Sequence, residues 1–442
     1  MPSFNFKNLN PSYIWRNIRF DKVVFICLIS LVVFGLIAQS SVSQGAFFQK
    51  QLIFAFLGIP VFYVGYILPT ETLKKLCWFA YGFAVMLLLW VLVQGTTALG
   101  AQRWITVGGF SIQPSEPAKI ACIIALAYWF QNHKPSSIFK VIKAGSLIML
   151  LPFGLIFIQP DLGTSLVLVA IFFSMVYWAG AKISQVLVLI SPLIVMITSA
   201  LGKRIYFAPS LKVGSHYITL DCSVVGLICI ISIVAYLAYH YKVWKSKWRS
   251  FWLSFYSFVI FLIAILGRPL AWDLLEPYQQ KRLTIFLDPQ VDPLGAGYNI
   301  IQSLIAIGSG GFLGQGYKHG RLTQGQFVPE QHTDFIFSSI AEEWGFVTCF
   351  LIILAFFTIC LRLYNLTKNV DDVFSRLIVV GVMAFLCFHV CVNIGMNIGL
   401  MPVTGVPLPL LSYGGTSLWV NLFSLGITQR IYSNNAPPTL FR

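Results

Sequence analysis

Residues 329–361 read PEQHTDFIFSSIAEEWGFVTCFLIILAFFTICL, a short polar segment that runs directly into a long apolar one. The apolar part begins at residue 335, and its only charged residues are the adjacent carboxylates Glu342 and Glu343. A run of about 20 apolar residues is long enough to cross the hydrocarbon core of a bilayer as a helix. This stretch therefore predicts a membrane-spanning helix with an acidic residue, Asp334, at its entrance.

The rest of the chain repeats this apolar pattern. The 442 residues are 57% hydrophobic and only 10% charged, whereas soluble proteins carry about a quarter charged residues. The sequence predicts an all-α fold, a polytopic transmembrane helix bundle of about 12 spans. We expect the spans at residues 22–39, 48–68, 74–98, 117–133, 141–158, 163–180, 184–202, 223–241, 251–267, 335–361, 376–398 and 416–432.

The basic residues predict the orientation of these spans. With the N-terminus in the cytoplasm, most of the 30 Lys and Arg residues fall in cytoplasmic loops or tails, as the positive-inside rule requires. Both termini are then cytoplasmic, and the long loop 268–334 lies outside. Most of the 15 acidic residues also fall outside, so we expect any chemistry to face outward. The net charge of +15 is explained by the loop bias, and no nucleic-acid binding is expected because no stretch outside the spans combines Lys and Arg with aromatic residues.

The nine cysteines lie almost entirely within apolar runs. A buried free cysteine behaves as a small hydrophobic residue, so we predict no disulfide framework. Cys387, His389 and Cys391 alternate along one expected span. Alternate positions of a helix point in different directions, which favours core packing over a metal site.

Two short motifs lie at expected outer helix ends. In residues 113–119, Ser115 suits an N-cap, and Glu116 and Lys119 form an i,i+3 pair. Two interpretations of this pair remain open: a neutralised ion pair at the interface, or charges positioned for an anionic substrate. Asp161, in a turn between two spans, suits a helix start on local evidence, and its outer location leaves a cation-binding role open.

The long loop contains two further candidates. Lys281 and Arg282 are either a solvated basic pair or a clamp for a pyrophosphate group. The glycine-rich segment 308–316 lacks the spacing and the βαβ context of a dinucleotide site. We interpret it as flexible backbone beside a substrate groove.

Asp334 is either an N-cap or, at the mouth of a half-dry cavity, a general base. Glu342 lies about 12 Å deeper along the same helix, and an ionisable group at that depth is expected to face a cavity or a partner. Segment 399–415 is apolar but rich in proline and glycine. Irregular backbone at membrane depth survives only where it is buried in protein or lines a wet cavity, so we predict a re-entrant segment.

Six motifs occur in order along the chain, and together they resemble the RodA/FtsW (SEDS) family, with wording closer to RodA, the elongation member. They are RWI at 103–105, QPSEPAK at 113–119, QPDLGTS at 159–165, DPLGAGYNIIQS at 292–303, PEQHTDFIF at 329–337 and PLPLLSYGGTS at 407–417.

The resemblance implies a peptidoglycan glycosyltransferase of the bacterial cytoplasmic membrane that polymerises lipid II on the outer face during cell elongation. It assigns Asp334 as the base that deprotonates the acceptor sugar in an inverting reaction. It implies a divalent cation, Mg²⁺ or Mn²⁺, or a basic residue at the leaving pyrophosphate, with Asp161 as the metal-ligand candidate. The implied partners are a class B penicillin-binding protein, other membrane proteins of the elongation complex and membrane lipid. The implied substrate-binding residues are Arg103, Glu116, Lys119, Lys281, Arg282, His332 and Ser412.

Members of this family resemble ten-span proteins, so residues 203–267 are predicted to be an inserted helix pair. The predicted parts are a tail 1–21, a seven-helix part 22–202, the insertion 203–267, a catalytic loop 268–334, a three-helix part 335–432 with the re-entrant segment 399–415, and a tail 433–442. Two other functions stay open. A transporter (flippase) of the lipid-linked precursor would also use broken helices and intramembrane charges, although no repeat joins the two halves. A non-catalytic scaffold would tolerate Asp334→Ala.

Overall fold

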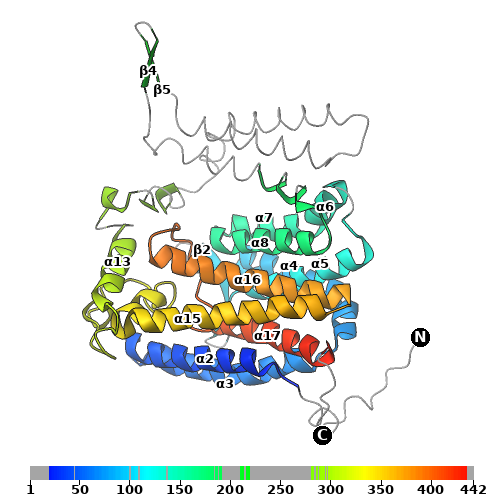
Figure 1. Ribbon diagram of the computed structural model, residues 1–442, viewed down its shortest axis with the longest axis horizontal. Helices are drawn as coiled ribbons and strands as arrows, with labels where there is room; N and C mark the ends of the chain where they lie inside the picture. The colour runs from blue at the N-terminus through cyan, green and yellow to red at the C-terminus, as the bar shows by residue number, and fades with distance from the viewer. Residues whose placement is uncertain are drawn as a thin grey trace.

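The structure is a computed structural model. It describes residues 19–43, 45–98, 101–107, 110–135, 138–183, 185–187, 189–191, 210–213, 216–219, 280–282, 285–286, 288–293, 295 and 297–435. The expected spans 223–241 and 251–267 lie outside the described residues. Long helices packed side by side form the body of the molecule (Figure 1).

The first part of the bundle contains α2 to α8. Their bounds are α2 Lys22–Val42, α3 Ala46–Ile67, α4 Thr70–Gln94, α5 Ser115–Asn132, α6 Ile138–Ala144, the π-helical turn η2 Gly145–Met149, α7 Leu150–Ile158 and α8 Leu162–Trp178. The second part contains the 3-10 turn η3 Pro289–Val291, α13 Tyr298–Gly310, α14 Arg321–Gln324, α15 Ile336–Asn369, α16 Val373–Asn397 and α17 Gly415–Asn435.

Six helices of the described residues are long and apolar enough to cross a membrane. They are Lys22–Val42, Phe47–Ile67, Thr70–Gln94, Lys140–Ile158, Ile336–Asn369 and Val373–Asn397. The all-α, polytopic fold class is confirmed, and the count of twelve spans stays a prediction. Both faces of such helices are apolar: α2 buries Leu28 and Leu31 and exposes Ile26 and Val33, as expected where lipid replaces water as the solvent.

Short strands were not predicted. The expected span 74–98 is wrong at its end, because α4 stops at Gln94 and Thr96–Ala98 forms strand β1. β1 pairs with β2 (Ala101–Val107), which pairs with β3 (Phe110–Ile112), both antiparallel. β4 (Ser210–Val213) and β5 (His216–Thr219) form a separate antiparallel pair. The first sheet connects α4 to α5 and carries Arg103 on β2.

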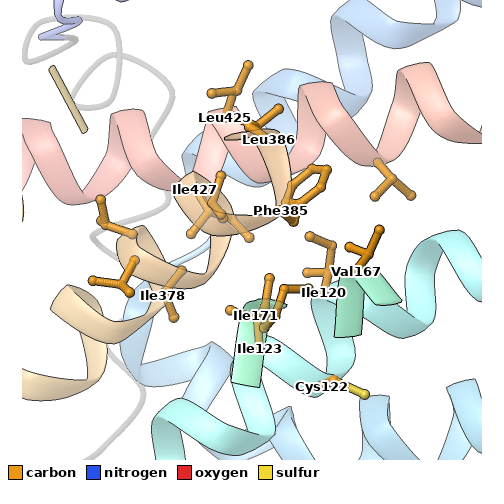
Figure 2. Close-up of a cluster of buried hydrophobic side chains, with 14 of the residues drawn as sticks. Ile120, Cys122, Ile123, Val167, Ile171, Ile378, Phe385, Leu386, Leu425 and Ile427 are labelled. Atoms are coloured by element: carbon orange, nitrogen blue, oxygen red, sulfur yellow. The ribbon is translucent and has the colours of Figure 1, made fainter. Parts of the chain in front are cut away.

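The hydrophobic core lies where α5, α8, α16 and α17 meet (Figure 2). Ile123 of α5, Ile171 of α8, Phe385 of α16 and Ile427 of α17 are all at most 1% exposed. α16 contributes Ile378, Phe385 and Leu386 to this cluster.

The chain between α16 and α17 is irregular and largely buried, as predicted for the re-entrant segment. Residues 398–414 contain no helix or strand. Leu408, Leu410 and Leu411 are nearly inaccessible, and the carbonyl of Leu411 accepts from Nε2 of Gln39 on α2 at 3.4 Å. Irregular backbone at membrane depth is stable only where its polar groups are shielded from lipid. The burial of this segment within the protein therefore supports the interpretation of a re-entrant segment.

Helix α15 is broken at Gly345, where φ is 73° and ψ is −174°. The backbone groups freed by the break bond to the glycine-rich segment 311–316. Phe346 N and Val347 N donate to the carbonyls of Gly311 and Phe312 at 2.9 and 3.2 Å. The carbonyls of residues 342 and 343 accept from the backbone N–H groups of residues 315 and 316, both at 2.9 Å. The segment expected to be flexible is therefore bound to the helix break.

The two carboxylates of α15, Glu342 and Glu343, accept hydrogen bonds from residues 322–324, which follow the glycine-rich segment. Glu342 accepts from the backbone N–H groups of Leu322 and Thr323, both at 2.8 Å, and from Oγ1 of Thr323 at 2.6 Å. Glu343 accepts from Ser41 Oγ at 2.6 Å and Gln324 Nε2 at 2.9 Å. Glu342 was expected to face a cavity or a partner, and the partner is the first turn of α14.

We expect Gly345→Ala to destabilise the protein by about 1–3 kcal/mol, the cost of holding a non-glycine residue in such a backbone conformation. A Cβ atom at Gly345 would also lie 2.3 Å from the backbone N of Gly314. The expected result is a lower thermal unfolding temperature of the detergent-solubilised protein. Gly308→Ala is the matched control, since Gly308 lies within α13 and a Cβ there meets nothing within 4 Å. Equal unfolding temperatures for the two variants would contradict the expectation.

Candidate active site

The backbone of residues 332–334 is held by hydrogen bonds from other elements. The carbonyl of residue 332 accepts from Gln39 Nε2 of α2 at 2.8 Å and from the backbone N–H of Tyr413 at 2.9 Å. The next carbonyl, that of residue 333, accepts from Ser412 Oγ at 2.6 Å. The hydroxyl of Ser412, predicted to bind substrate, thus connects the re-entrant segment to the residue before Asp334.

The carbonyl of Asp334 is held by two buried amides of α16. Nδ2 of Asn393 donates to it at 2.9 Å, and Nδ2 of Asn397 donates to it at 3.0 Å. Phe335, rather than Asp334, is the N-cap of α15. The interpretation of Asp334 as an N-cap is therefore wrong, and its side chain is left for another role.

Asp334 is half-buried, and its carboxylate lies near Gly405 and Arg282. A Cβ atom placed on Gly405 would lie 3.5 Å from Oδ2 of Asp334 and 4.0 Å from Nη1 of Arg282. Gly405 has a φ of 74°, which glycine adopts without steric cost. The absence of a side chain at residue 405 keeps the space between the carboxylate and the guanidinium open.

Burial raises the pKa of Asp334 to about 6. The value of about 6 is the net result of burial, of the carboxylates of Glu330 and Asp161, which also raise the pKa, and of the guanidinium groups of Arg282 and Arg103, which lower it. A carboxyl group with a pKa near neutral is suited to accept a proton at physiological pH.

Arg103 and Asp161 lie close enough to act on Asp334, but each also has a local partner. Arg103 donates from Nε to the carbonyl of Gln159 at 3.1 Å and from Nη2 to the carbonyl of Pro160. Asp161 is the N-cap of α8, as local evidence predicted: Oδ1 accepts from the backbone N–H of Thr164 at 3.2 Å.

A metal-ligand role for Asp161 has little support in its contacts. Its Oδ2 accepts from Thr164 Oγ1 at 2.9 Å and from Gln113 Nε2 at 3.1 Å. Among the residues that the structure describes, no group of three or more His, Cys, Asp and Glu side chains is arranged to hold a metal ion. The donors at Asp161 do not fit a metal site, and the divalent cation stays a prediction.

Glu116 and Lys119 form a buried ion pair rather than one at an exposed surface. Lys119 Nζ lies 2.8 Å from Glu116 Oε1, with side-chain exposures of 0% and 3%. The helix begins at Ser115, so the N-cap is Pro114 and not Ser115 as predicted. Burial of both charges favours the ion-pair interpretation over direct binding of an anionic substrate.

A buried histidine connects this pair to the re-entrant segment. Nζ of Lys119 lies 3.1 Å from Nε2 of His389, and Nδ1 of His389 lies 3.4 Å from the carbonyl of Pro407. These contacts are satisfied if Lys119 donates to Nε2 of a neutral imidazole whose Nδ1–H donates to Pro407. His389 was expected to be a core residue, and it is a buried hydrogen-bonded one.

Two other predicted residues lie at the edge of the site. Lys281 is 56% exposed and forms an ion pair with Asp292 at 2.7 Å. The ring of His332 stacks on Phe47, with centroids 4.4 Å apart. Burial lowers the pKa of His332, and the carboxylate of Glu330 opposes that shift.

The sequence did not reveal that Asn393 and Asn397 bond to the backbone of Asp334. It also did not distinguish the hydrogen-bonded His389 from an apolar core residue. These three residues are spaced i, i+4 and i+8, which places them on one face of α16. A polar stripe inside an apolar span was the signal that would have found them.

Comparisons with known proteins agree with this architecture. The model of the FtsW/RodA/SpoVE cell cycle protein family matches residues 16–212 and 216–436. The chain is 34% identical to a peptidoglycan glycosyltransferase RodA of Treponema pallidum, over 93% of this chain and 97% of the relative. It is 30% identical to a peptidoglycan glycosyltransferase MrdB of Escherichia coli K12, over 97% of each chain.

A solved structure has the same fold. A chain of a peptidoglycan synthase complex that coordinates polymerization and crosslinking aligns with a TM-score of 0.66 and 28% identity, over 94% of this chain and 98% of that one. The sequence match, its coverage and the shared fold lead to one assignment. The chain is an integral membrane protein that belongs to the FtsW/RodA/SpoVE family.

Proposed function

We propose that this protein is a peptidoglycan glycosyltransferase of the RodA type, which polymerises lipid II into glycan strands on the outer face of the cytoplasmic membrane during cell elongation. The observation that carries the proposal is the half-buried Asp334, whose backbone is held by hydrogen bonds and whose carboxylate lies near Arg282. The names of the RodA and MrdB relatives support the same activity.

Asp334 acts as the general base. Its carboxylate takes the proton of the 4-hydroxyl on the acceptor sugar, and the resulting oxygen attacks the anomeric carbon of the donor. The new glycosidic bond forms as the bond to the pyrophosphate breaks, which inverts the anomeric centre and releases undecaprenyl pyrophosphate. A pKa of about 6 keeps the base ionised at neutral pH while retaining affinity for a proton.

Arginine side chains stabilise the charge of the pyrophosphate as it leaves. A guanidinium group bonds two phosphate oxygens with a planar pair of donors, and fixed positive charge at a developing anion lowers the barrier. Arg282 is the first candidate because it lies beside Asp334. Arg103 is the second candidate, since two of its donors are already bonded to the backbone carbonyls of residues 159 and 160. Lys281, at the exposed edge, meets the substrate earlier on its path. No step is assigned to a divalent cation.

The remaining predicted residues support this machinery. Glu116 and Lys119 act as a buried ion pair beneath the re-entrant segment. The ring of His332 and the hydroxyl of Ser412 shape the backbone and the wall next to the base. The proposed parts are unchanged: loop 268–334 is the extracytoplasmic catalytic loop, and segment 399–415 is the re-entrant segment of the three-helix part 335–432.

The proposed topology has both termini in the cytoplasm and Asp334 at the extracytoplasmic end. Since sugar polymerisation outside the cell must be followed by crosslinking of the strands, we infer a class B penicillin-binding protein as the partner. A structural relative from a complex that joins polymerization to crosslinking supports this partner. Other elongation-complex membrane proteins and the surrounding lipid complete its environment.

The rate of polymerisation should fall as the pH decreases through about 6, because only the ionised carboxylate of Asp334 accepts a proton. Arg282→Gln should move this midpoint to higher pH, since the lost guanidinium lowers the pKa of Asp334. The measurement is the initial rate with lipid II across this pH range, with Arg282→Lys as the variant that keeps the charge. If the midpoint of the rate profile has the same pH in the wild type, Arg282→Gln and Arg282→Lys, the assignment of Asp334 as the base is contradicted.

The deciding experiment is reconstitution of the purified protein with its transpeptidase partner in liposomes that contain labelled lipid II. A polymerase converts the label to glycan strands. A transporter would move lipid II between leaflets without forming strands, and a scaffold would do neither. Absence of strands in the presence of transport would overturn the proposal in favour of the transporter.

A further inference from the structure

We propose that Asn393 and Asn397 are positioning residues of the glycosyl transfer, which fix the backbone of Asp334 so that its carboxylate meets the acceptor hydroxyl. The inference rests on the proposed function, because it assigns a role to residues that act through the base. Neither amide contacts the carboxylate in the hydrogen bonds of the structure, so neither is proposed as a catalytic residue.

Both amides are directed at one atom. Asn393 and Asn397 lie one turn apart on α16, both are fully buried, and both donate to the carbonyl oxygen of Asp334. A carbonyl oxygen accepts two hydrogen bonds, so this acceptor is saturated. The carbonyl and the side chain of Asp334 share one Cα atom, and fixing the first restricts where the second points.

Each amide has a further bond that connects Asp334 to another part of the site. Asn393 Nδ2 also donates to the carbonyl of Val406 at 2.8 Å. Val406 follows Gly405, which borders the space between Asp334 and Arg282. Asn397 Oδ1 accepts from the backbone N–H of Ser338 at 3.2 Å, in the first turn of α15. The two asparagines therefore fix the base relative to the site wall and to its own helix.

Burying an amide in an apolar interior is costly unless its polar atoms are bonded. One hydrogen bond from each amide goes to the carbonyl of the proposed base. Further bonds to Val406 and Ser338 fix that residue relative to its surroundings. A displacement of about 1 Å in a reacting group is sufficient to lower a rate about 10²-fold.

The test compares Asn393→Ala, Asn397→Ala and the double variant in the reconstituted polymerisation assay. We expect kcat to fall about 10-fold for each single variant, because the other amide still holds the carbonyl, and about 10²-fold for the double variant. KM for lipid II should change little, since neither residue contacts the substrate.

The pH profile distinguishes positioning from loss of folded protein. A carboxylate released from its buried position should have a lower pKa, because burial is the main cause of its elevation, with Glu330, Asp161, Arg282 and Arg103 as the charged groups that act on it. The acid limb of the rate profile should therefore move to lower pH in the double variant. A merely structural role would reduce the amount of active protein and leave the limb in place.

Asn421→Ala is the matched control. Asn421 is also fully buried, and its amide bonds only to Ser417 of its own helix, α17, in the hydrogen bonds of the described residues. This variant should keep the wild-type rate per folded molecule and the wild-type pH profile. Wild-type kcat in the double variant, or a lower kcat with an unmoved acid limb, would overturn the inference. Undiminished activity of Asp334→Asn would instead overturn the assignment of Asp334 as the base, on which the inference rests.

Discussion

Asp334→Asn should lower the rate of lipid II polymerisation by about 10²–10⁴-fold, the contribution that general bases typically make. The amide has the shape of the carboxylate but cannot accept the proton of the acceptor hydroxyl. The hydrogen bonds that hold residues 332–334 are accepted by their backbone carbonyls and not by the side chain of Asp334. The variant should therefore fold and bind lipid II. The measurement is the initial rate of strand formation at neutral pH, with lipid II binding followed separately.

Asp288→Asn is the control for replacing a carboxylate by an amide. Asp288 is exposed and its side chain accepts from the backbone N–H of Gln290 at the start of η3. Its variant should polymerise at the wild-type rate. Undiminished polymerisation by Asp334→Asn would remove Asp334 from the mechanism, and another group would then have to act as the base.

Lys119→Met should destabilise the protein by about 3–5 kcal/mol, because it leaves the charge of Glu116 buried without its partner. The two charged atoms lie 2.8 Å apart and both side chains are inaccessible. The double variant Glu116→Gln with Lys119→Met removes both charges and should recover most of the lost stability. Thermal unfolding of the detergent-solubilised proteins measures each change.

Lys74→Met provides the comparison with ion pairs whose carboxylates are accessible. Lys74, with a side-chain exposure of 17%, lies 2.9 Å from Glu71 and 3.6 Å from Asp372, whose side chains are 72% and 38% exposed. Both carboxylates keep access to water without the lysine, so the expected loss is at most about 1 kcal/mol. The activity of the double variant separates the two interpretations of Glu116 and Lys119. A stable double variant that polymerises normally supports a buried ion pair, and a stable but inactive one supports substrate binding. Wild-type stability of Lys119→Met alone would show that the pair carries no structural role.

Much of the helical framework could be predicted from the sequence, because apolar runs of membrane length need no tertiary information. Three helices were expected to start at residues 22, 376 and 416, and α2, α16 and α17 start at Lys22, Val373 and Gly415. The strand Thr96–Ala98 was not, because an apolar span and a short strand share residue types, and the strand exists only through pairing with β2.

The candidate site was predicted in part. Asp334 and Arg282 were selected, and the structure brings the side chains of both close to Gly405. The buried amides were missed because Asn393 and Asn397 act through a carbonyl far away in the sequence. The ion pair of Lys119 was left open because spacing along one helix does not reveal whether another helix covers it. Only tertiary packing decides such questions.

One loop spans the break at Gly345. Before the break, the carbonyls of residues 342 and 343 accept from the N–H groups of residues 315 and 316, and after it the N–H groups of Phe346 and Val347 donate to the carbonyls of residues 311 and 312. The longer half of α15 carries exposed side chains such as Phe350 and Phe357. Because the same segment is bonded to both halves, the two parts of α15 are connected through the loop as well as through the chain.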